Sequence, residues 1–228
     1  MNRQPISPEG PARGAVLVAV LCALALTVLA STVGSGPLPI DISVRDALRV
    51  GGPVPLPLDL LNTIGGALVW DAGVAILFAA LWLAHRRTEA AWIGGGVLAG
   101  EALSVAIKLV VDRQRPPGIA VIDLVTQASF PSGHTTRAVI TGALLVLFWP
   151  RGPRSRIVAG IVAVVVAVLM GLARIVAGEH WPTDVVGAYL VAAIVVAGVV
   201  AIRARFTRSA PAHPQPSVPW PDDAAPSP

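Results

Sequence analysis

The chain has 228 residues, of which 54% are hydrophobic and 13% are charged. Soluble globular domains carry about 25% charged residues, and the mean hydropathy of this chain is +0.72. A chain this short cannot hide several uncharged runs of near-membrane length, so the composition excludes an ordinary water-soluble fold. The net charge of +4 is spread over short clusters and forms no basic stripe, which argues against nucleic acid as a partner. Cys22 is the only cysteine, which excludes an intrachain disulfide and a cysteine-based zinc site.

Six apolar segments approach the roughly 20 residues that a bilayer-spanning helix needs. They predict an all-α, polytopic membrane protein with six transmembrane helices. The first segment could instead be a signal peptide, because Arg3 and Arg13 precede it, but its apolar run exceeds the usual signal core of about 7–15 residues. The fourth segment is short and can be entered from the membrane interface. In chain order the predicted helices are 14–33, 66–84, 90–110, 134–149, 157–177 and 184–202.

The predicted spans divide the chain into a short N-terminus (residues 1–13), a six-helix membrane domain (14–206) and a proline-rich tail (207–228). The composition of the tail is typical of a disordered segment. Cytoplasmic loops of membrane proteins carry an excess of Lys and Arg, and the distribution of arginines here predicts that both termini are cytoplasmic. Residues 40–50 have an amphipathic spacing, which suits either a short helix in the membrane interface or a plain loop.

Three polar clusters lie at the ends of predicted helices, and the predicted topology places all three on the extracytoplasmic face. The first follows the third helix, the second precedes the fourth, and the third joins the fifth helix to the sixth. Together they hold three cations, a Ser-Gly pair, two histidines and an aspartate: Lys108, Arg115, Ser132, Gly133, His134, Arg174, His180 and Asp184.

The three cations indicate an anionic ligand, because an unpaired charge near an apolar boundary is costly. Phosphate suits both the planar fork of arginine and the point charge of lysine. Ser132 and Gly133 follow a proline of the kind found in the first helical turn. Free backbone N–H groups at such a helix start bind anions with the helix dipole behind them. These features predict a phosphate site that uses no metal and no other cofactor.

The two histidines suit the two tasks of phosphoryl transfer, in which one group attacks phosphorus and another protonates the departing oxygen. Asp184 lies four residues after His180. It can accept a proton from one ring nitrogen and orient the other, as the aspartate does in a Ser-His-Asp triad. This makes His180 the predicted nucleophile. His134 is then the predicted general acid, and afterwards the base that activates water. Each residue taken singly also has a structural interpretation, such as a hydrogen-bonded pair at a helix start.

The three clusters resemble the signature motifs of the type 2 phosphatidic acid phosphatase superfamily, which also includes the vanadium haloperoxidases. The family pattern KxxxxxxRP, PSGH and SRxxxxxHxxxD stands here as KLVVDRQRP, PSGH and ARIVAGEHWPTD, and the similarity extends over about residues 58–205. The resemblance implies six helices, an extracytoplasmic site, a covalent phosphohistidine at His180, acid–base catalysis by His134 and no metal cofactor. It also implies lipid substrates: phosphatidate, phosphatidylglycerophosphate, or polyprenyl phosphates and diphosphates.

Ala173 departs from the family pattern, because it stands where the family has a phosphate-binding serine. The loss of one neutral hydrogen bond costs about 0.5–1.5 kcal/mol, which is too little to imply an inactive protein. Activity therefore remains the better interpretation, and Ala173 is the only sequence feature that points toward a non-catalytic protein.

The sequence therefore predicts a metal-independent phosphatase of a cell membrane, in a bacterial plasma membrane, that hydrolyses a lipid phosphate or a polyprenyl (di)phosphate. An external site makes polyprenyl diphosphate recycling an attractive role. One alternative is a phosphotransferase that uses the same site and passes the phosphoryl group to an alcohol. Another is a non-catalytic protein that binds or transports lipid phosphate. The expected partners are the bilayer and a lipid phosphate, and the oligomeric state is left open.

Five further polar residues lie near the three clusters. Glu101 and Asp71 are interpreted either as partners of the site's cations or as carboxyl groups bonded inside the bundle. Arg137 either selects a diphosphate or extends outward to the lipid headgroups. Asp112 and Arg113 are predicted to form a solvated loop pair.

Overall fold

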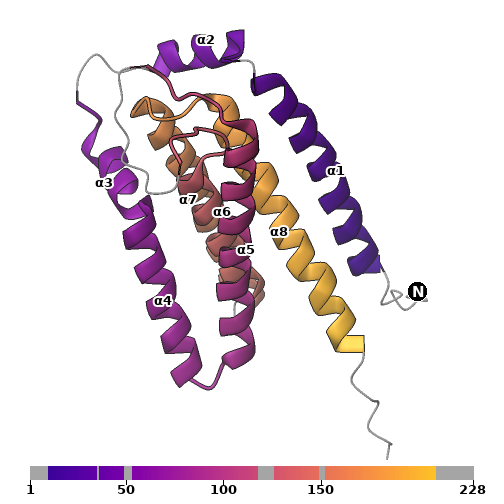
Figure 1. Ribbon diagram of the computed structural model, residues 1–228. Helices are drawn as coiled ribbons and strands as arrows, with labels where there is room; N and C mark the ends of the chain where they lie inside the picture. The colour runs from indigo at the N-terminus through magenta and orange to yellow at the C-terminus, as the bar shows by residue number, and fades with distance from the viewer. Residues whose placement is uncertain (1–9, 35, 49–52, 118–125, 149–151, 209–228) are drawn as a thin grey trace, which may run out of the picture.

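The computed structural model describes residues 10–34, 36–48, 53–117, 126–148 and 152–208. Within these ranges every regular element is an α-helix, which confirms the predicted all-α class (Figure 1). In chain order the helices are α1 (Gly10–Val33), α2 (Pro39–Leu48), α3 (Leu56–Gly65), α4 (Ala67–Leu83), α5 (Arg87–Val111), α6 (Gly133–Leu147), α7 (Pro153–Val176) and α8 (Pro182–Arg208).

Among the described helices, α1, α5, α7 and α8 are each long and apolar enough to cross a membrane. A fifth span results if α3 and α4 are taken together, a pair that is bent by 65°. Helix α6 has 15 residues, fewer than the roughly 20 of a full span. Trp149, where the predicted fourth segment ends, lies outside the described residues. The described chain is thus a membrane protein with up to five complete spans, and the sixth stays a prediction.

Helix α3 is an element that the hydropathy pattern does not predict. Proline is favourable in the first helical turn, where its missing N–H has no intrahelical partner, and a proline occupies that turn of α3. The helix ends at Gly65 and packs against α7. A Cβ atom at Gly65 would lie 2.8 Å from Cδ2 of His134 and 2.7 Å from Sδ of Met170. Glycine at this position therefore allows α3 to close over the start of α6.

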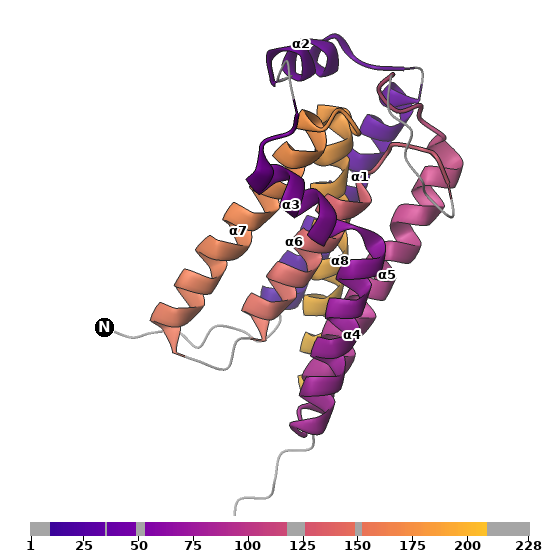
Figure 2. The same cartoon turned by 90° about the vertical axis from the view of Figure 1, so that its left-hand side faces the viewer.

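Helix α6 lies at the centre of the bundle and packs against α5, α7 and α8 (Figure 2). Small residues permit the close approach of membrane helices, and Gly96 on α5 has this role. A Cβ atom there would lie 2.5 Å from Cδ1 of Leu144 on α6. The resulting core joins α5, α6 and α8 and contains Ile93, Val97, Ile140, Leu144, Ala192, Val195 and Val199.

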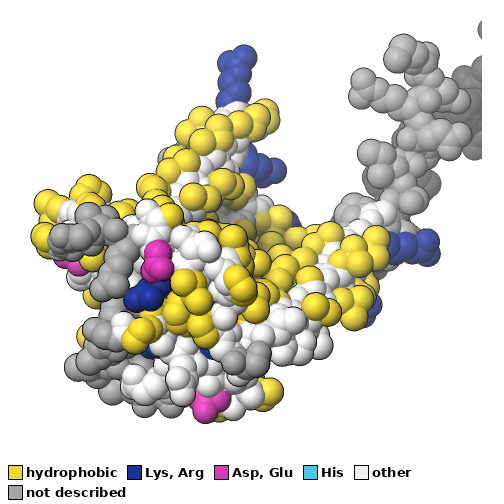
Figure 3. Space-filling view, turned by 90° about the horizontal axis from the view of Figure 1, so that it is seen from above, with side chains coloured by type: hydrophobic (Ala, Val, Ile, Leu, Met, Phe, Trp, Pro, Cys, Tyr) yellow, Lys and Arg dark blue, Asp and Glu magenta, His cyan; other side chains and the backbone are white. Residues whose placement is uncertain are grey.

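The outer faces of the long helices are apolar. Leu17, Leu21 and Leu24 on α1 are 58%, 56% and 60% exposed, and Ile161 and Val164 on α7 are exposed to a similar degree. Figure 3 shows hydrophobic side chains over much of the surface seen from the end that carries α2. Large exposed apolar patches mark interaction or membrane surfaces. On helices of membrane length, this surface is suited to contact with lipid.

The amphipathic segment between the first two predicted spans is a helix, not a plain loop. Helix α2 lies across the end of the bundle (Figure 1), with Ile40 and Ile42 exposed and Asp41 fully buried. Residues 49 and 50 of the predicted segment lie outside the described residues. The placement of α2 in the membrane interface stays a prediction.

The first turn of α1 and the last turns of α8 lie at the same end of the bundle, opposite α2 (Figure 1). Arg13 of α1 and Arg205 of α8 line one pocket there, and the two helices pack along each other. Most of the predicted N-terminal segment (1–9) and of the predicted tail (209–228) lies outside the described residues. The shared end agrees with termini on one membrane side and does not specify which side.

Candidate active site

A cavity of about 610 Å³ lies at the end of the bundle near α2, within the volume range of roughly 300–1,000 Å³ that is common for ligand pockets. Four helix ends line it, namely the first turns of α4 and α6 and the last turns of α5 and α7, together with the loop that joins α7 to α8. Six of the eight predicted site residues line this one cavity, although they are far apart in the chain: Lys108, Arg115, Gly133, His134, Arg174 and His180.

His180 lies in the short loop between α7 and α8 and is buried, as is Asp184 in the first turn of α8. Nδ1 of His180 is 3.2 Å from Oδ2 of Asp184. The backbone N–H of Trp181 donates to the same oxygen at 2.8 Å. If Nδ1 carries the ring proton and donates it in a hydrogen bond to Asp184, Nε2 keeps its lone pair. Arg115 Nη1 lies 3.3 Å from Nε2, on the cavity side. The contact with Asp184 thus fixes the ring with its Nε2 directed toward Arg115.

The environment of His180 favours the neutral imidazole. Burial lowers the pKa of His180 well below its usual value of 6.5, and the nearby charges of Arg174, Arg115 and Lys108 lower that pKa further. A neutral ring is the form that can attack phosphorus. The cations that would bind a phosphate thus also keep the candidate nucleophile unprotonated.

The burial of a neutral His180 predicts a pH-dependent contribution to stability. The unfolded chain protonates this histidine near its ordinary pKa of about 6.5, whereas the folded protein keeps it neutral because its pKa is lowered. Its contribution is therefore complete above that pH and is lost as the pH falls below it, by at most about 1.4 kcal/mol per pH unit. We expect the free energy of unfolding of the wild type, relative to a His180→Asn variant, to fall as the pH is lowered from about 6.5 to about 5. Thermal unfolding in detergent measures this difference, and a constant difference would contradict it.

His134 lies in the first turn of α6, and its Nε2 is 3.2 Å from the carbonyl oxygen of Asn62 on α3. The side chain of Asn62 accepts a hydrogen bond from Nη1 of Arg174 at 3.2 Å. Asn62 therefore links a candidate acid–base residue to a candidate phosphate ligand. No sequence motif includes it, because it belongs to the unpredicted helix α3. The closest signal in the sequence is Gly65, three positions later, which permits the approach.

Polar contacts orient the three predicted phosphate-binding cations. Lys108 Nζ donates to the carbonyl oxygen of Ala128 at 2.5 Å. Arg115 Nη1 donates to the carbonyl oxygen of Glu179 at 3.1 Å. Arg174 Nη2 donates to the carboxylate of Glu179. Backbone carbonyls carry no net charge, so these contacts with Lys108 and Arg115 fix the direction of the side chains without neutralising them.

Ser132 and Asp184, the other two predicted site residues, do not line the cavity. Ser132 is fully buried as the N-cap of α6, and its N–H donates to the backbone carbonyl oxygen of Asp184 at 3.1 Å. The expectation of a free N–H at Ser132 is therefore wrong, because the first turn of α8 packs against it. Gly133 does line the cavity. Ala173, where the family has serine, is buried and lies outside the cavity lining.

Residues 89–208 match the PAP2 superfamily, and this range contains all three motifs. The chain belongs to the PAP2 superfamily. The match covers more than half of the chain and confirms the family that the motifs indicate.

Two curated relatives have informative names. The decaprenylphosphoryl-5-phosphoribose phosphatase of Mycobacterium tuberculosis is 36% identical over 115 residues, which cover 49% of this chain and 60% of the relative. The undecaprenyl-diphosphatase of Bacillus subtilis is 33% identical over 128 residues, which cover 53% of this chain and 63% of the relative. The chain thus spans about 60% of the length of these two relatives.

A solved structure has a similar fold: the crystal structure of a transmembrane PAP2 type phosphatidylglycerolphosphate phosphatase from Bacillus subtilis. The TM-score is 0.64 at 20% identity, with 83% of this chain and 95% of that chain covered. At this identity the likeness concerns the fold alone. It supports the arrangement of helices that brings the PAP2 motifs together.

Arg113, inside the first PAP2 motif, is not the solvated residue that the sequence predicts. Its side chain is 1% exposed, and it donates to Asp184 Oδ1 at 2.5 Å, Asp41 Oδ2 at 2.6 Å and Thr183 Oγ1 at 2.7 Å. The neighbouring Asp112 is exposed and adopts a left-handed backbone conformation. This turn at the end of α5 directs Arg113 inward. The prediction fails because both acidic partners lie about seventy positions away in the chain.

Arg137, one turn after the PSGH motif, forms a two-contact pair with Glu101 on α5. The distances are 2.7 Å from Nε to Oε1 and 2.8 Å from Nη2 to Oε2, and Asp71 Oδ1 lies 3.8 Å from Nε. All three residues line the cavity of the PAP2 motifs. Arg137 therefore points into the cavity and not outward to headgroups. Glu101 is therefore a partner of a cation, which is the first of the two interpretations that the sequence allows.

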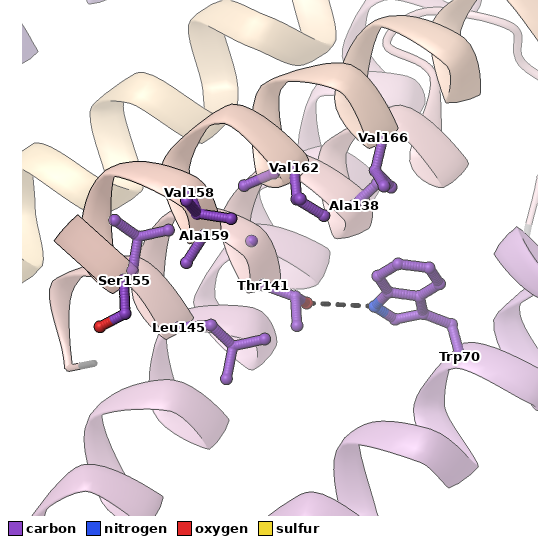
Figure 4. Close-up of a pocket in the computed structure, with 12 residues that line it drawn as sticks. Trp70, Ala138, Thr141, Leu145, Ser155, Val158, Ala159, Val162 and Val166 are labelled. Atoms are coloured by element: carbon purple, nitrogen blue, oxygen red, sulfur yellow. Dashed lines mark hydrogen bonds between the residues drawn. The ribbon is translucent and has the colours of Figure 1, made fainter. Parts of the chain in front are cut away.

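A separate, apolar pocket of about 580 Å³ lies between α4, α6 and α7. Trp70 lines this pocket, while its neighbours in the chain, Val69 and Asp71, line the cavity. The indole Nε1 of Trp70 donates to Thr141 Oγ1 at 3.1 Å (Figure 4). Valine side chains of α7 form the facing wall: Val158, Val162 and Val166. The pocket is thus mostly hydrophobic, and its polar side chains are the Trp70–Thr141 pair and Ser155, whose hydroxyl donates to the carbonyl oxygen of Gly152.

Proposed function

We propose that this PAP2 protein is a membrane lipid phosphatase that hydrolyses a phosphate ester through a phosphohistidine on His180. One observation carries the proposal: His134 and His180 line the same cavity as Lys108, Arg115 and Arg174. Cations with two histidines, one of them oriented by a carboxylate, suit phosphoryl transfer. The names of the PAP2 relatives, both phosphatases of lipid-linked phosphates, support the same activity.

The proposed mechanism begins with the phosphate bound among the cations and beside Gly133. Nε2 of His180 attacks phosphorus, the P–O bond to the lipid breaks, and His134 gives a proton to the departing oxygen. Asp184 stabilises the positive charge that develops on the His180 ring. His134, now deprotonated, takes a proton from water, which attacks the phosphohistidine and releases inorganic phosphate. His180 returns to its neutral form.

The lipid part of the substrate suits the apolar pocket beside the cavity. A lipid that diffuses in the bilayer can place its chain between α4, α6 and α7 while its phosphate enters the cavity. Trp70 and Asp71 are adjacent in the chain and line the pocket and the cavity respectively, so the same turn of α4 contributes to both. This arrangement supports a lipid substrate over a soluble phosphate ester.

The charge distribution in the cavity favours a lipid monophosphate over a diphosphate. Arg137 is the cation that a second phosphate would use, but Glu101 binds it through two contacts and Asp71 lies close by. Two carboxylates around one guanidinium leave this part of the cavity with no surplus positive charge. A second phosphate would have to displace Glu101. The interpretation of Arg137 as a diphosphate selector is therefore the weaker one.

The site is proposed to face the extracytoplasmic side, with both termini in the cytoplasm and α6 as the sixth span. The arginine bias of the loops supports this orientation. The start of α1 and the end of α8 lie at the same end of the bundle, opposite α2 (Figure 1), which supports termini on one side. A bacterial plasma membrane matches the sources of the named relatives.

The direct test is to assay the purified protein in mixed micelles against polyprenyl monophosphate, polyprenyl diphosphate, phosphatidate and phosphatidylglycerophosphate. We expect release of inorganic phosphate, with kcat/KM for a monophosphate about tenfold or more above that for the matched diphosphate. A chelator such as EDTA is expected to leave the rate unchanged, since the cations occupy the role of a metal. Binding of every lipid without phosphate release would contradict the proposal. Transfer of label to an added alcohol in place of water would indicate the phosphotransferase alternative.

A further inference from the structure

A chain of buried charged groups leads from helix α2 to the candidate nucleophile. Asp41 of α2 accepts from Arg113 at 2.6 Å, Arg113 donates to Oδ1 of Asp184 at 2.5 Å, and Oδ2 of Asp184 lies 3.2 Å from Nδ1 of His180. The side chains of these residues are between 0% and 2% exposed. Neither Asp41 nor Arg113 lines the cavity, so neither is placed to touch a substrate.

Further hydrogen bonds satisfy Asp41 and keep it at this position. Its Oδ1 accepts from the backbone N–H of Thr183 at 2.9 Å and from the Thr183 hydroxyl at 2.8 Å. Its Oδ2 also accepts from the backbone N–H of Leu38 at 3.0 Å. Burying a charged group costs several kcal/mol unless partners compensate for it. The full set of partners around Asp41 indicates a site that is built for a carboxylate.

We propose that Asp41 and Arg113 are positioning residues for the nucleophile, with Arg113 holding Asp184 against His180 and Asp41 holding Arg113 in place. The proposal rests on the phosphatase function proposed above. Arg113 takes one carboxylate oxygen of Asp184, which leaves the other to face Nδ1 of His180. Asp41 takes the other end of the guanidinium. Together they set the direction in which Nε2 of His180 points.

The proposal has an electrostatic part as well as a geometric one. His180 faces cations from three elements, namely Lys108 of α5, Arg115 after α5 and Arg174 of α7, and also the titratable His134 of α6. Glu179, beside His180 in the chain, is paired with Arg174. Asp184 is the carboxylate in contact with the His180 ring. Asp41 offsets the charge of Arg113, so that Asp184 remains able to stabilise the imidazolium formed when Nε2 bonds to phosphorus.

Asp41→Asn tests the proposal, and Asp46→Asn is its matched control, because Asp46 is an exposed acidic residue of the same helix. Asparagine keeps the size of Asp41 and one acceptor oxygen but removes the charge. We expect kcat to fall by about tenfold to a hundredfold with KM changed less than threefold, since small displacements of reacting groups cost rates of this order. Asp46→Asn is expected to match the wild type. Wild-type kcat in Asp41→Asn, in a preparation where His180→Asn is inactive, would overturn the positioning role and leave the phosphatase function intact.

The pH profile separates electrostatic positioning from simple loss of packing. Because the folded protein keeps His180 neutral, the comparison is made at the acid end, where kcat/KM begins to fall. Removal of the negative charge in Asp41→Asn makes protonation of His180 harder, so this fall should begin at a lower pH than in the Asp46→Asn control. Arg113→Met removes a positive charge, and the fall should begin at a higher pH than in the same control. The control cancels the ionisation of the substrate, and equal shifts, or shifts of the opposite sign, would contradict the proposal.

Thr183→Val provides the second test if Asp41→Asn does not fold. It removes the hydroxyl that contacts both Asp41 and Arg113 and changes no charge. We expect kcat to fall by about twofold to tenfold, the range for one lost hydrogen bond, with KM unchanged. Unaltered kcat would count against the network as a positioning device.

Discussion

Replacement of His180 by asparagine is expected to lower kcat for phosphate release by about 10⁴-fold or more, the range found when a nucleophile or its partner is removed. Asparagine can still donate a hydrogen bond to Asp184, whose Oδ2 lies 3.2 Å from Nδ1 of the native ring, so the loop is expected to keep its fold. It has no nitrogen lone pair for attack on phosphorus. With ³²P-labelled lipid, alkaline-stable label on the protein should appear in the wild type and be absent from His180→Asn.

The matched control for this variant is His85→Asn. His85 is exposed in the turn between α4 and α5, and its backbone has a positive φ of 59°, which asparagine tolerates well. The control is expected to keep wild-type kcat. Full activity in His180→Asn would overturn the assigned nucleophile. Loss of activity in both variants would show that the histidine chemistry is not confined to the cavity.

Replacement of His134 by glutamine is expected to lower kcat on a lipid phosphate by about 10²- to 10⁴-fold, the usual contribution of a general acid–base group. The glutamine amide can still donate to the carbonyl oxygen of Asn62, which lies 3.2 Å from Nε2 of the native residue. The contact with α3 is therefore retained while the proton-transfer group is lost. Steady-state phosphate release measures the effect.

The two roles assigned to His134 are separated with p-nitrophenyl phosphate, whose leaving group needs no proton. In His134→Gln the first step should proceed with this substrate, while hydrolysis of the phosphohistidine remains slow. A burst of nitrophenolate equal to the protein concentration is expected, followed by a slow steady state. A slow reaction without a burst would show that formation of the intermediate needs His134 even when the leaving group needs no proton. This outcome would contradict the role of His134 as the general acid of the first step.

The membrane class, the family and the convergence of the motifs follow from sequence features that are local or nearly so. Hydropathy predicts where α1, α4, α5, α7 and α8 lie, with the largest difference at the end of α8, six residues after the predicted one, because a bilayer requires long uninterrupted apolar helices. Since successive spans alternate in direction, motifs at alternate helix ends must meet on one face. For this reason the amino-acid sequence is sufficient to assign six residues to one cavity: Lys108, Arg115, Gly133, His134, Arg174 and His180.

The tertiary structure alone decides which charged groups are buried and what they contact. The sequence pattern predicts a solvated Arg113, yet this residue lies between Asp41 and Asp184, 72 and 71 positions away. Ser132 donates its N–H to Asp184, and Asn62 reaches His134 from a helix that hydropathy does not reveal. The physical reason is that the sequence pattern records which residues a helix must turn toward lipid, whereas the partner of a buried polar group depends on the packing of several helices at once. Burial without such partners is costly, so the fold selects them, and they are not visible in any one segment.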